Sequence, residues 1–359
     1  MAAVTSDRDF GARSRAVAGV IEVPDAREDP KGFAAAVAEG AARESVDVVL
    51  PGTEGALLAL AAHSDRFSDQ VTLGACPPTT TLVATDMVAT LARAAEAGVK
   101  ALSARVLGVD GPPEPGDVRF PVVVKPLRSE VPVDGALRRY HSRCAGDAEA
   151  LILALAALPT GIGMVQAYVE GRLLNVNGVA WKGEVVADVH EQALRTWPVD
   201  CGPVSYARTI APEAPLAEQA QALIAALDWS GIFNLQFIEA DSGLFLVDVN
   251  PRLYTSIGLA VAAGANLPAI WVDLLLGRKP QPTAYRVGVR LRSEGDLRSL
   301  THLFRSGARR DAVAGLMPQP NTAHAIASIS DPKPGLSYLR RLPGRLTSKQ
   351  GVLARAIPS

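Results

Sequence analysis

The sequence contains little cysteine and little net charge, and each shortage excludes a class of protein. Its cysteines are Cys76, Cys144 and Cys201, which are widely spaced and form no CxxC pair. Neither a disulfide framework nor a zinc site is therefore expected, and a reducing compartment, most simply the cytoplasm, is indicated. A formal net charge of −1 removes the electrostatic case for binding nucleic acid or an anionic membrane surface.

The chain also lacks an uninterrupted apolar run. Its first residues, MAAVTSDRDFGARSR, carry charges where a secretory signal peptide has its apolar core. The stretch 256–277 is long enough to cross a membrane, but polar and helix-breaking residues interrupt it. These residues are Gly264, Asn266, Pro268 and Asp273. We therefore expect a soluble protein with no membrane partner, in which 256–277 forms two short buried helices joined by the GANLP turn.

Two signatures of catalysis or cofactor binding are missing as well. No Ser/His/Asp or Cys/His arrangement is visible along the chain, so catalysis by a nucleophilic side chain is disfavoured. No GxGxxG turn stands near the N-terminus, so direct binding of a dinucleotide by that segment is unsupported.

Strands and helices alternate over the first 85 residues. Residues 15–24 and 46–52 have the composition of strands, and 31–45 and 54–67 that of helices. This alternation predicts an N-terminal parallel α/β domain over residues 1–85. Because such a sheet normally has a strand and a helix ahead of segment 15–24, the sheet is expected to lack its first strand.

The remaining chain of this 359-residue protein predicts an α+β domain over 86–280 and a small C-terminal subdomain with a loosely held tail over 281–359. A helix with Thr85 or Asp86 as its N-cap opens the second domain. The strand RFPVVVKPLRSE ends in a lysine and is followed by a loop, VPVDGALRRY. Farther along, GMVQAYVEG reads as a strand, and two hairpins follow, the first turning at Lys182-Gly183.

The second hairpin, IFNLQFIEADSGLFLVDVN, carries the most informative pattern. If 241–243 form a three-residue loop with Gly243 at positive φ, Ala240 lies opposite Leu244 and Gln236 opposite Asp248. Because side chains alternate along a strand, one face then carries Gln236, Asp248 and Asn250. The opposite, apolar face would carry Phe237, Phe245, Val247 and Val249.

This polar end of the hairpin is a candidate site for a hard cation. Mg²⁺ takes oxygen ligands, usually one or two carboxylates with water and phosphate. Arg252 lies just beyond, where a guanidinium can hold phosphate oxygens. The alternative is structural: Asp248 and Asn250 form a hydrogen-bonded turn, and Arg252 makes a surface ion pair.

Other cations have two interpretations each. Lys125 can offer a point charge to a phosphate or simply reach water, and Arg128, Arg138 and Arg139 follow it in a loop. Arg195 lies in a stretch rich in proline and glycine, where a role in binding a carboxylate is as well supported as a structural one.

Four segments in this order resemble the ATP-grasp superfamily of carboxylate–amine and carboxylate–thiol ligases, in particular the carbamoyl-phosphate-synthase type of ATP-grasp domain. They are FPVVVKP, VQAYVEG, NVNGVAW and FNLQFIEADSGLFLVDVNPR. The resemblance covers roughly 86–277 and implies a two-lobed domain that binds ATP and Mg²⁺. It also implies small carboxylate and amine substrates and allows a homodimer, although the sequence shows no interface.

The resemblance assigns roles by position. Lys125 corresponds to a lysine on the ATP phosphates, and Arg252 to an arginine that faces the transferred phosphate and the substrate. The segment that would meet adenine comprises Gln166, Ala167, Tyr168 and Val169. The positions that would bind magnesium are Gln236, Asp248 and Asn250. In such enzymes a carboxylate attacks the γ-phosphate, and an amine or thiol displaces the resulting acyl phosphate.

The sequence departs from the family pattern in several places. Met87 stands where many members have a lysine, and Leu173 and Leu174 occupy a stretch that often holds a glutamate for the ribose. The phosphate-covering loop has a single glycine, Gly135, and the metal positions have a single carboxylate, Asp248. These departures motivate the alternative of a nucleotide-binding protein with weak or lost catalysis, whereas the presence together of Lys125 and the metal-side residues favours the ligase. An ATP-dependent carboxylase on the same fold is the third interpretation.

Overall fold

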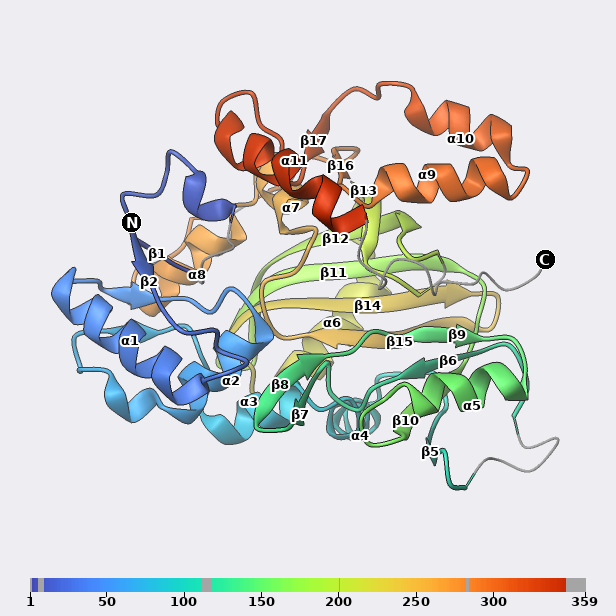
Figure 1. The fold of residues 1–359 in the computed structure, drawn as a ribbon, viewed down its shortest axis with the longest axis horizontal. Coiled ribbons are helices and arrows are strands. Elements are labelled where there is room, and N and C mark those ends of the chain that lie inside the picture. Colours follow the sequence, from blue (N-terminus) through green and yellow to red (C-terminus); the bar gives the residue numbers. More distant parts are fainter. Residues whose placement is uncertain (1, 6–9, 112–117, 200, 282–283, 347–359) are drawn as a thin grey trace.

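A computed structural model describes residues 2–5, 10–111, 118–199, 201–281 and 284–346. Figure 1 shows an N-terminal part of short strands and helices, two β-sheets in the middle of the chain, and C-terminal helices above the larger sheet. The predicted combination of α/β and α+β elements is confirmed. Residues 347–359, the end of the predicted C-terminal subdomain and tail, and residues 112–117 lie outside the described residues.

The N-terminal part has parallel strand pairs. Its elements are β1 (Ala2–Thr5), η1 (Gly11–Arg13), β2 (Gly19–Glu22), α1 (Pro30–Arg43), β3 (Val48–Val49), α2 (Glu54–Ala62), η2 (Ser64–Arg66), β4 (Thr72–Leu73) and α3 (Pro78–Ala84). β1 pairs in parallel with β2, and β3 with β4. The expectation that no strand precedes segment 15–24 was wrong, because β1 lies there. Its four residues, AAVT, are too few to show a strand pattern.

The smaller sheet contains four strands in the order β5-β10-β6-β9. Its strands, and the helix whose leucines pack on it, are β5 (Ala104–Gly108), β6 (Val122–Lys125), β9 (Arg143–Ala145), β10 (Ile162–Ala167) and α5 (Ala148–Ala156). The predicted loop after β6 is instead a hairpin of β7 (Glu130–Val133) and β8 (Ala136–Arg139). Its turn residues Asp134 and Gly135 have φ of 50° and 80°, and Asp-Gly favours such a turn.

The larger sheet contains seven strands in the order β15-β14-β11-β12-β13-β16-β17. The first five are β15 (Gly243–Asn250), β14 (Gly231–Ala240), β11 (Arg172–Trp181), β12 (Glu184–Thr196) and β13 (Val204–Thr209). β11 and β12 turn at Lys182-Gly183, as predicted, with positive φ at both residues. α4 (Met87–Glu96) and α6 (Ala214–Ala226) cover the apolar face. Asp86 caps α4 by accepting from the Ala89 amide, which confirms one of the two predicted caps.

The C-terminal part extends the larger sheet. Its elements, with the two helices before it, are α7 (Ile257–Ala263), α8 (Leu267–Leu275), β16 (Arg290–Arg292), α9 (Asp296–Arg305), α10 (Arg309–Leu316), β17 (Thr322–His324) and α11 (Pro332–Leu346). β16 pairs with β13 and β17 with β16. The two predicted helices within 256–277 are confirmed as α7 and α8. Across the described ranges no single helix has the length and apolarity to cross a membrane; α7 and α8 reach them only together, bent by 95°.

Candidate functional site

Two rows of polar side chains cross the larger sheet to β15, the first from β12 and the second from β11. The first row is Glu191, Asn175, Gln236 and Asp248, and the second is Asn177, Asn234 and Asn250. Residues that face each other across a strand pair point to the same side, and their Cβ atoms lie about 5 Å apart. All seven side chains therefore lie on one face, opposite the apolar face that α4 and α6 cover.

The β14–β15 hairpin gives the predicted pairing by a different route. Ala240 pairs with Gly243, so the turn is shorter than the predicted three-residue loop. A bulge between Gln236 and Phe237 then shifts the register, and Gln236 still lies opposite Asp248. The shift changes the apolar face: Phe237 pairs with the buried Leu246, and neither Phe245 nor Val247 takes the predicted place. One extra residue in β15 exchanges the faces of the residues around it.

The predicted metal-binding side chains are held together by hydrogen bonds. Asn250 Nδ2 donates to Asp248 Oδ2 at 3.0 Å and to Asn234 Oδ1 at 3.1 Å. Gln236 Nε2 donates to the same Asn234 oxygen at 3.3 Å. The nitrogens of both amides are thus turned toward Asn234, which leaves their oxygens for other partners.

Arg252 connects this cluster to the N-terminal part. Its NH2 group donates to Asn250 Oδ1 at 2.7 Å, and its Nε donates to Glu54 Oε2 at 3.2 Å. Glu54 is the first residue of α2 and is buried, and its other oxygen, Oε1, has no hydrogen-bond partner. Burial raises the pKa of Glu54, whereas the Arg252 guanidinium lowers it.

Lys125 approaches the cluster from the smaller sheet. Its Nζ donates to the Val247 carbonyl, one residue before Asp248. Burial lowers the pKa of Lys125, and the charge of Asp248 opposes this shift. The lysine and the aspartate therefore interact, although they lie on different sheets.

A second cation lies near Arg252. Arg139 comes from β8, and burial lowers its pKa; the Arg252 guanidinium lowers it further, and Glu130 and Glu54 raise it. Two guanidinium groups that come close to each other form a local field that suits an anion.

The segment that the resemblance assigns to adenine ends β10, between the two sheets. Gln166 is buried and donates through Nε2 to the Leu102 carbonyl at 3.5 Å. Ala167 is the last residue of the strand, and the Tyr168 amide donates to the Pro121 carbonyl at 3.0 Å. Val169 follows outside the strand, before β11.

Arg195 is bound elsewhere. Its Nε and NH2 donate to the two oxygens of the buried Asp296 at 2.6 and 2.9 Å, and its guanidinium lies 4.2 Å from the ring centre of Tyr206. Asp296 is the first residue of α9 and also pairs with Arg292 at 3.0 Å. These contacts join Arg195 of β12 to α9 and to β13, and none of them involves a residue of the Asp248 cluster.

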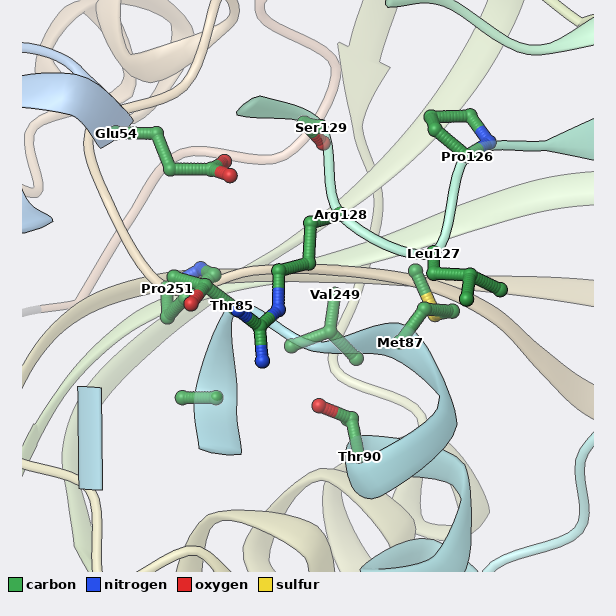
Figure 2. Close-up of a pocket in the computed structure, with 11 residues that line it drawn as sticks. Glu54, Thr85, Met87, Thr90, Pro126, Leu127, Arg128, Ser129, Val249 and Pro251 are labelled. Carbon is green, nitrogen blue, oxygen red and sulfur yellow. The ribbon is translucent and has the colours of Figure 1, made fainter. Parts of the chain in front are cut away.

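A small pocket opens beside the cluster (Figure 2). Its lining includes Glu54, Met87, Arg128 and Val249. Arg128 Nε donates to Asp86 Oδ2 at 3.0 Å, and the Met87 amide donates to the Leu127 carbonyl at 2.9 Å. Met87, which replaces the family's lysine, thus lies at the pocket where a cation would have stood.

Sequence reasoning missed most of the polar face. Glu191, Asn175, Asn177, Asn234 and Ser256 were not predicted as part of the site. The signal for them was present: NVNG in β11 and FNLQ in β14 place amides at every second position of strands that are otherwise apolar. Apolar packing of a strand does not require amide side chains at alternate positions, so this spacing indicates that the strands share a polar surface.

The donor set fits Mg²⁺. One carboxylate, Asp248, and the amide oxygens of Gln236 and Asn250 match the oxygen ligands that this ion prefers, and the Asn250 oxygen also accepts from Arg252. In the part of the chain that the structure describes, no group of three or more His, Cys, Asp or Glu side chains could hold a metal ion. A site here must therefore include amide oxygens, water or phosphate.

Comparison with known proteins identifies the fold. Residues 162–296 match the profile of a family described as ATP-grasp in the biosynthetic pathway with Ter operon. No characterised protein sequence matches the chain significantly.

Several solved structures are similar. An L-amino acid ligase from Bacillus licheniformis has a TM-score of 0.57 and 14% identity, over 72% of this chain and 64% of that chain. The biotin carboxylase domain of the Hydrogenobacter thermophilus 2-oxoglutarate carboxylase, in complex with MgADP, ADP and bicarbonate, has a TM-score of 0.58 and 13% identity, over 80% and 67%. N5-carboxyaminoimidazole synthetase from Staphylococcus aureus, complexed with ADP, has a TM-score of 0.60 and 12% identity, over 80% and 73%.

The matched region spans less than two thirds of the L-amino acid ligase, and identities this low speak for the fold alone. The matched family is an ATP-grasp family, and the similar structures are ATP-grasp enzymes. This agrees with the resemblance of the segments around Lys125 and Asp248. The chain thus has the ATP-grasp fold, and its residues 162–296 match the ATP-grasp family associated with the Ter operon.

Proposed function

We propose that the protein is an ATP- and Mg²⁺-dependent ligase that activates a small carboxylate as an acyl phosphate for attack by an amine. The observation that carries the proposal is the pairing of Gln236 with Asp248 on one sheet, beside Lys125 from the other. A half-buried lysine from one sheet that interacts with the charge of a carboxylate on the other supports a site for a phosphate and its counter-ion. Arg139 and Arg252 support the same assignment.

In this proposal, the nucleotide is held from the smaller sheet. Lys125 binds phosphate oxygens as a point charge, and Arg139 from the β7–β8 hairpin adds a second cation above them. The segment 166–169 offers backbone groups to adenine, because β10 ends at Ala167 and its pairing ends there.

The metal is held from the larger sheet, by Gln236, Asp248 and Asn250. Bound there, Mg²⁺ supplies charge neutralisation for the transferred phosphoryl group. Arg252 is fixed by Glu54 and Asn250, so its guanidinium is already oriented toward the same region. The chain contributes positioning and charge, because the substrate carboxylate itself is the nucleophile. Arg195 is left out of this site because Asp296 holds it.

The test is ADP release by the purified protein, with MgATP and a panel of small carboxylic acids and amines. We expect release that needs one acid and one amine together, and hydroxylamine should trap the acyl phosphate as a hydroxamate. If a folded protein releases no ADP with any pair in a broad panel, the ligase proposal fails.

A second candidate is a nucleotide-binding protein that has lost turnover. Met87 at the pocket and the two amides among the metal positions favour it. Calorimetry that shows tight ATP binding, with no phosphoryl transfer to any acceptor, would support this candidate. A carboxylase on the same fold is separated from both by ADP release that depends on bicarbonate.

A further inference from the structure

A chain of hydrogen bonds leads from a buried carboxylate to the proposed metal site. Asn177 Nδ2 donates to Glu191 Oε2 at 2.7 Å, and Asn234 Nδ2 donates to Asn177 Oδ1 at 2.6 Å. Asn250 Nδ2 then donates to Asn234 Oδ1 at 3.1 Å. The chain crosses β12, β11, β14 and β15, and each bond has its donor on the side of the metal site.

The direction of this chain follows from the chemistry of its first member. An ionised carboxylate only accepts hydrogen bonds, whereas an amide has a donor end and an acceptor end. Glu191 therefore requires the nitrogen of Asn177, which turns the oxygen of Asn177 to Asn234. Because the nitrogen of Asn234 then donates to Asn177, the oxygen of Asn234 faces Gln236 and Asn250. Each amide orients its neighbour.

The last amides are two proposed metal ligands. Asn234 Oδ1 accepts from the nitrogens of both Gln236 and Asn250. With their nitrogens engaged, both side chains turn their oxygens away from Asn234, and oxygen is the atom that Mg²⁺ binds. The oxygen of Asn250 also accepts from Arg252. If Asn234 turned around, its nitrogen would face theirs. Gln236, which lacks the contacts of Asn250 with Arg252 and Asp248, would then turn its nitrogen toward the metal.

Burial makes the orientation strict. Glu191 has no exposed surface, and Asn177 and Asn234 are 1% and 2% exposed, so water cannot replace a lost partner. In such surroundings an unpaired donor or acceptor is costly. The donors to Glu191 also include Asn175 at 2.9 Å and Ser256 at 2.8 Å; like Asn177, both are neutral. All of these hydrogen bonds use the Glu191 carboxylate as an acceptor.

We infer that Glu191 is a positioning residue: through Asn177 and Asn234 it sets which atom Gln236 turns toward the metal and, together with Arg252, which atom Asn250 turns there. This inference rests on the proposed function, because it concerns the same metal site. It assigns Glu191 a role at a distance, since its side chain bonds to Asn175, Asn177 and Ser256, none of which is a proposed metal ligand.

The test compares variants that remove the acceptor with one that keeps it. In Glu191→Met no acceptor remains, whereas Glu191→Gln removes the charge and can keep a carbonyl oxygen at the Oε2 position. Its new nitrogen would then face Asn175, whose Oδ1 has no partner and can turn to accept. Ser256→Ala is the matched control, because it removes a bond to the same oxygen outside the chain of amides.

The measurement is the affinity for Mn²⁺ in the presence of a non-hydrolysable ATP analogue, by electron paramagnetic resonance, with metal-free analogue binding measured alongside. Losses of outer contacts to metal ligands commonly weaken metal binding by about 10- to 100-fold. We expect this loss in Glu191→Met, little change in Glu191→Gln or Ser256→Ala, and unchanged metal-free analogue binding in all three. A partial rescue is expected in Glu191→Met/Asn177→Asp, where a carboxylate again accepts from Asn234.

The outcomes separate the two claims. If the wild type binds neither Mn²⁺ nor the analogue, the proposed function fails and this inference fails with it. If the wild type binds both and Glu191→Met keeps its Mn²⁺ affinity, the inference alone is overturned. Equal losses in Glu191→Met and Glu191→Gln would also overturn it, because charge would then be the cause. If Glu191→Met does not fold, Asn177→Leu, which breaks the chain on another strand, must show the same Mn²⁺ loss.

Discussion

At the scale of single residues, the candidate site differs from a typical magnesium site by its amides. Only Asp248 brings a negative charge to the metal positions, and this charge also acts on Lys125. Single substitutions should therefore have large and separable effects.

Asp248→Asn should lower Mg·ATP turnover by about 10²-fold or more, because it removes the one charge opposite the metal. Metal-free nucleotide binding should change little. The matched control is Asp241→Asn, an exposed residue in the turn of the same hairpin. Steady-state ADP release from the wild type and the two variants checks this prediction, and equal turnover in all three proteins would remove Asp248 from the site.

Glu191 should give the stability a characteristic pH dependence. Burial raises the pKa of Glu191 above its ordinary 4.5, and hydrogen bonds from Ser256, Asn175 and Asn177 oppose this shift. The folded protein thus holds this proton more tightly than the unfolded chain, so the contribution of the group to stability decreases as pH rises through the raised pKa. The melting temperature of the wild type relative to Glu191→Gln should therefore fall as the pH rises above 4.5. Parallel curves would contradict the raised pKa.

At the scale of elements, the β7–β8 hairpin is fastened to the N-terminal part. Arg27 Nε pairs with the buried Glu130 at 3.0 Å, and the Leu137 amide donates to the Arg27 carbonyl at 2.6 Å. The hairpin carries Arg139, so its position affects the proposed phosphate site.

Arg27→Ala should loosen the hairpin, because it leaves the Glu130 carboxylate buried without its cation. Hydrogen exchange over 130–139 should become faster, and ATP binding should weaken several-fold. The control is Arg138→Ala, whose pair with Glu28 is exposed on both sides and so contributes little. Unchanged exchange in Arg27→Ala would mean that backbone contacts alone hold the hairpin.

The elements also show how far sequence reasoning reaches. Composition and alternation predicted the strand ending at Lys125, the turn at Lys182-Gly183 and the cap at Asp86, because each depends on neighbouring residues. They did not predict the β15 bulge, since no residue type marks an extra residue in a strand. The pairing of Gln236 with Asp248 was correct although the loop was wrong, because the bulge compensates for the shorter turn. The β7–β8 hairpin was missed despite its Asp-Gly turn.

At the scale of the whole molecule, the site joins segments far apart in the sequence. Glu54 from α2, Lys125 from β6 and Arg252 after β15 meet around one cluster. Such contacts leave no local signature, so Glu54 could not be predicted from sequence. The resemblance to a family supplied the positions within 86–277, but not the contribution of the N-terminal part.

Arg195 has a structural role at this scale, because it ties the larger sheet to α9. Asp296→Ala should lower the free energy of unfolding by about 3 kcal/mol, since it leaves Arg195 and Arg292 without their buried partner. Arg278→Ala, which removes an exposed pair with Asp273, should change it by less than about 1 kcal/mol. Chemical denaturation measures both.

Arg195→Met should lower the melting temperature and leave the turnover of the folded protein little changed, because Arg195 is held by Asp296. Lost turnover at an unchanged melting temperature would return Arg195 to the active site.

The most direct test of the central claim is a crystal structure with Mn²⁺ and a non-hydrolysable ATP analogue. The account predicts an anomalous peak at coordinating distance, about 2 Å, from Asp248 and an amide oxygen of Asn250 or Gln236. It also predicts analogue phosphates at Lys125 and adenine against 166–169. Nucleotide bound elsewhere, or a metal with no contact to the β14–β15 hairpin, would contradict the account.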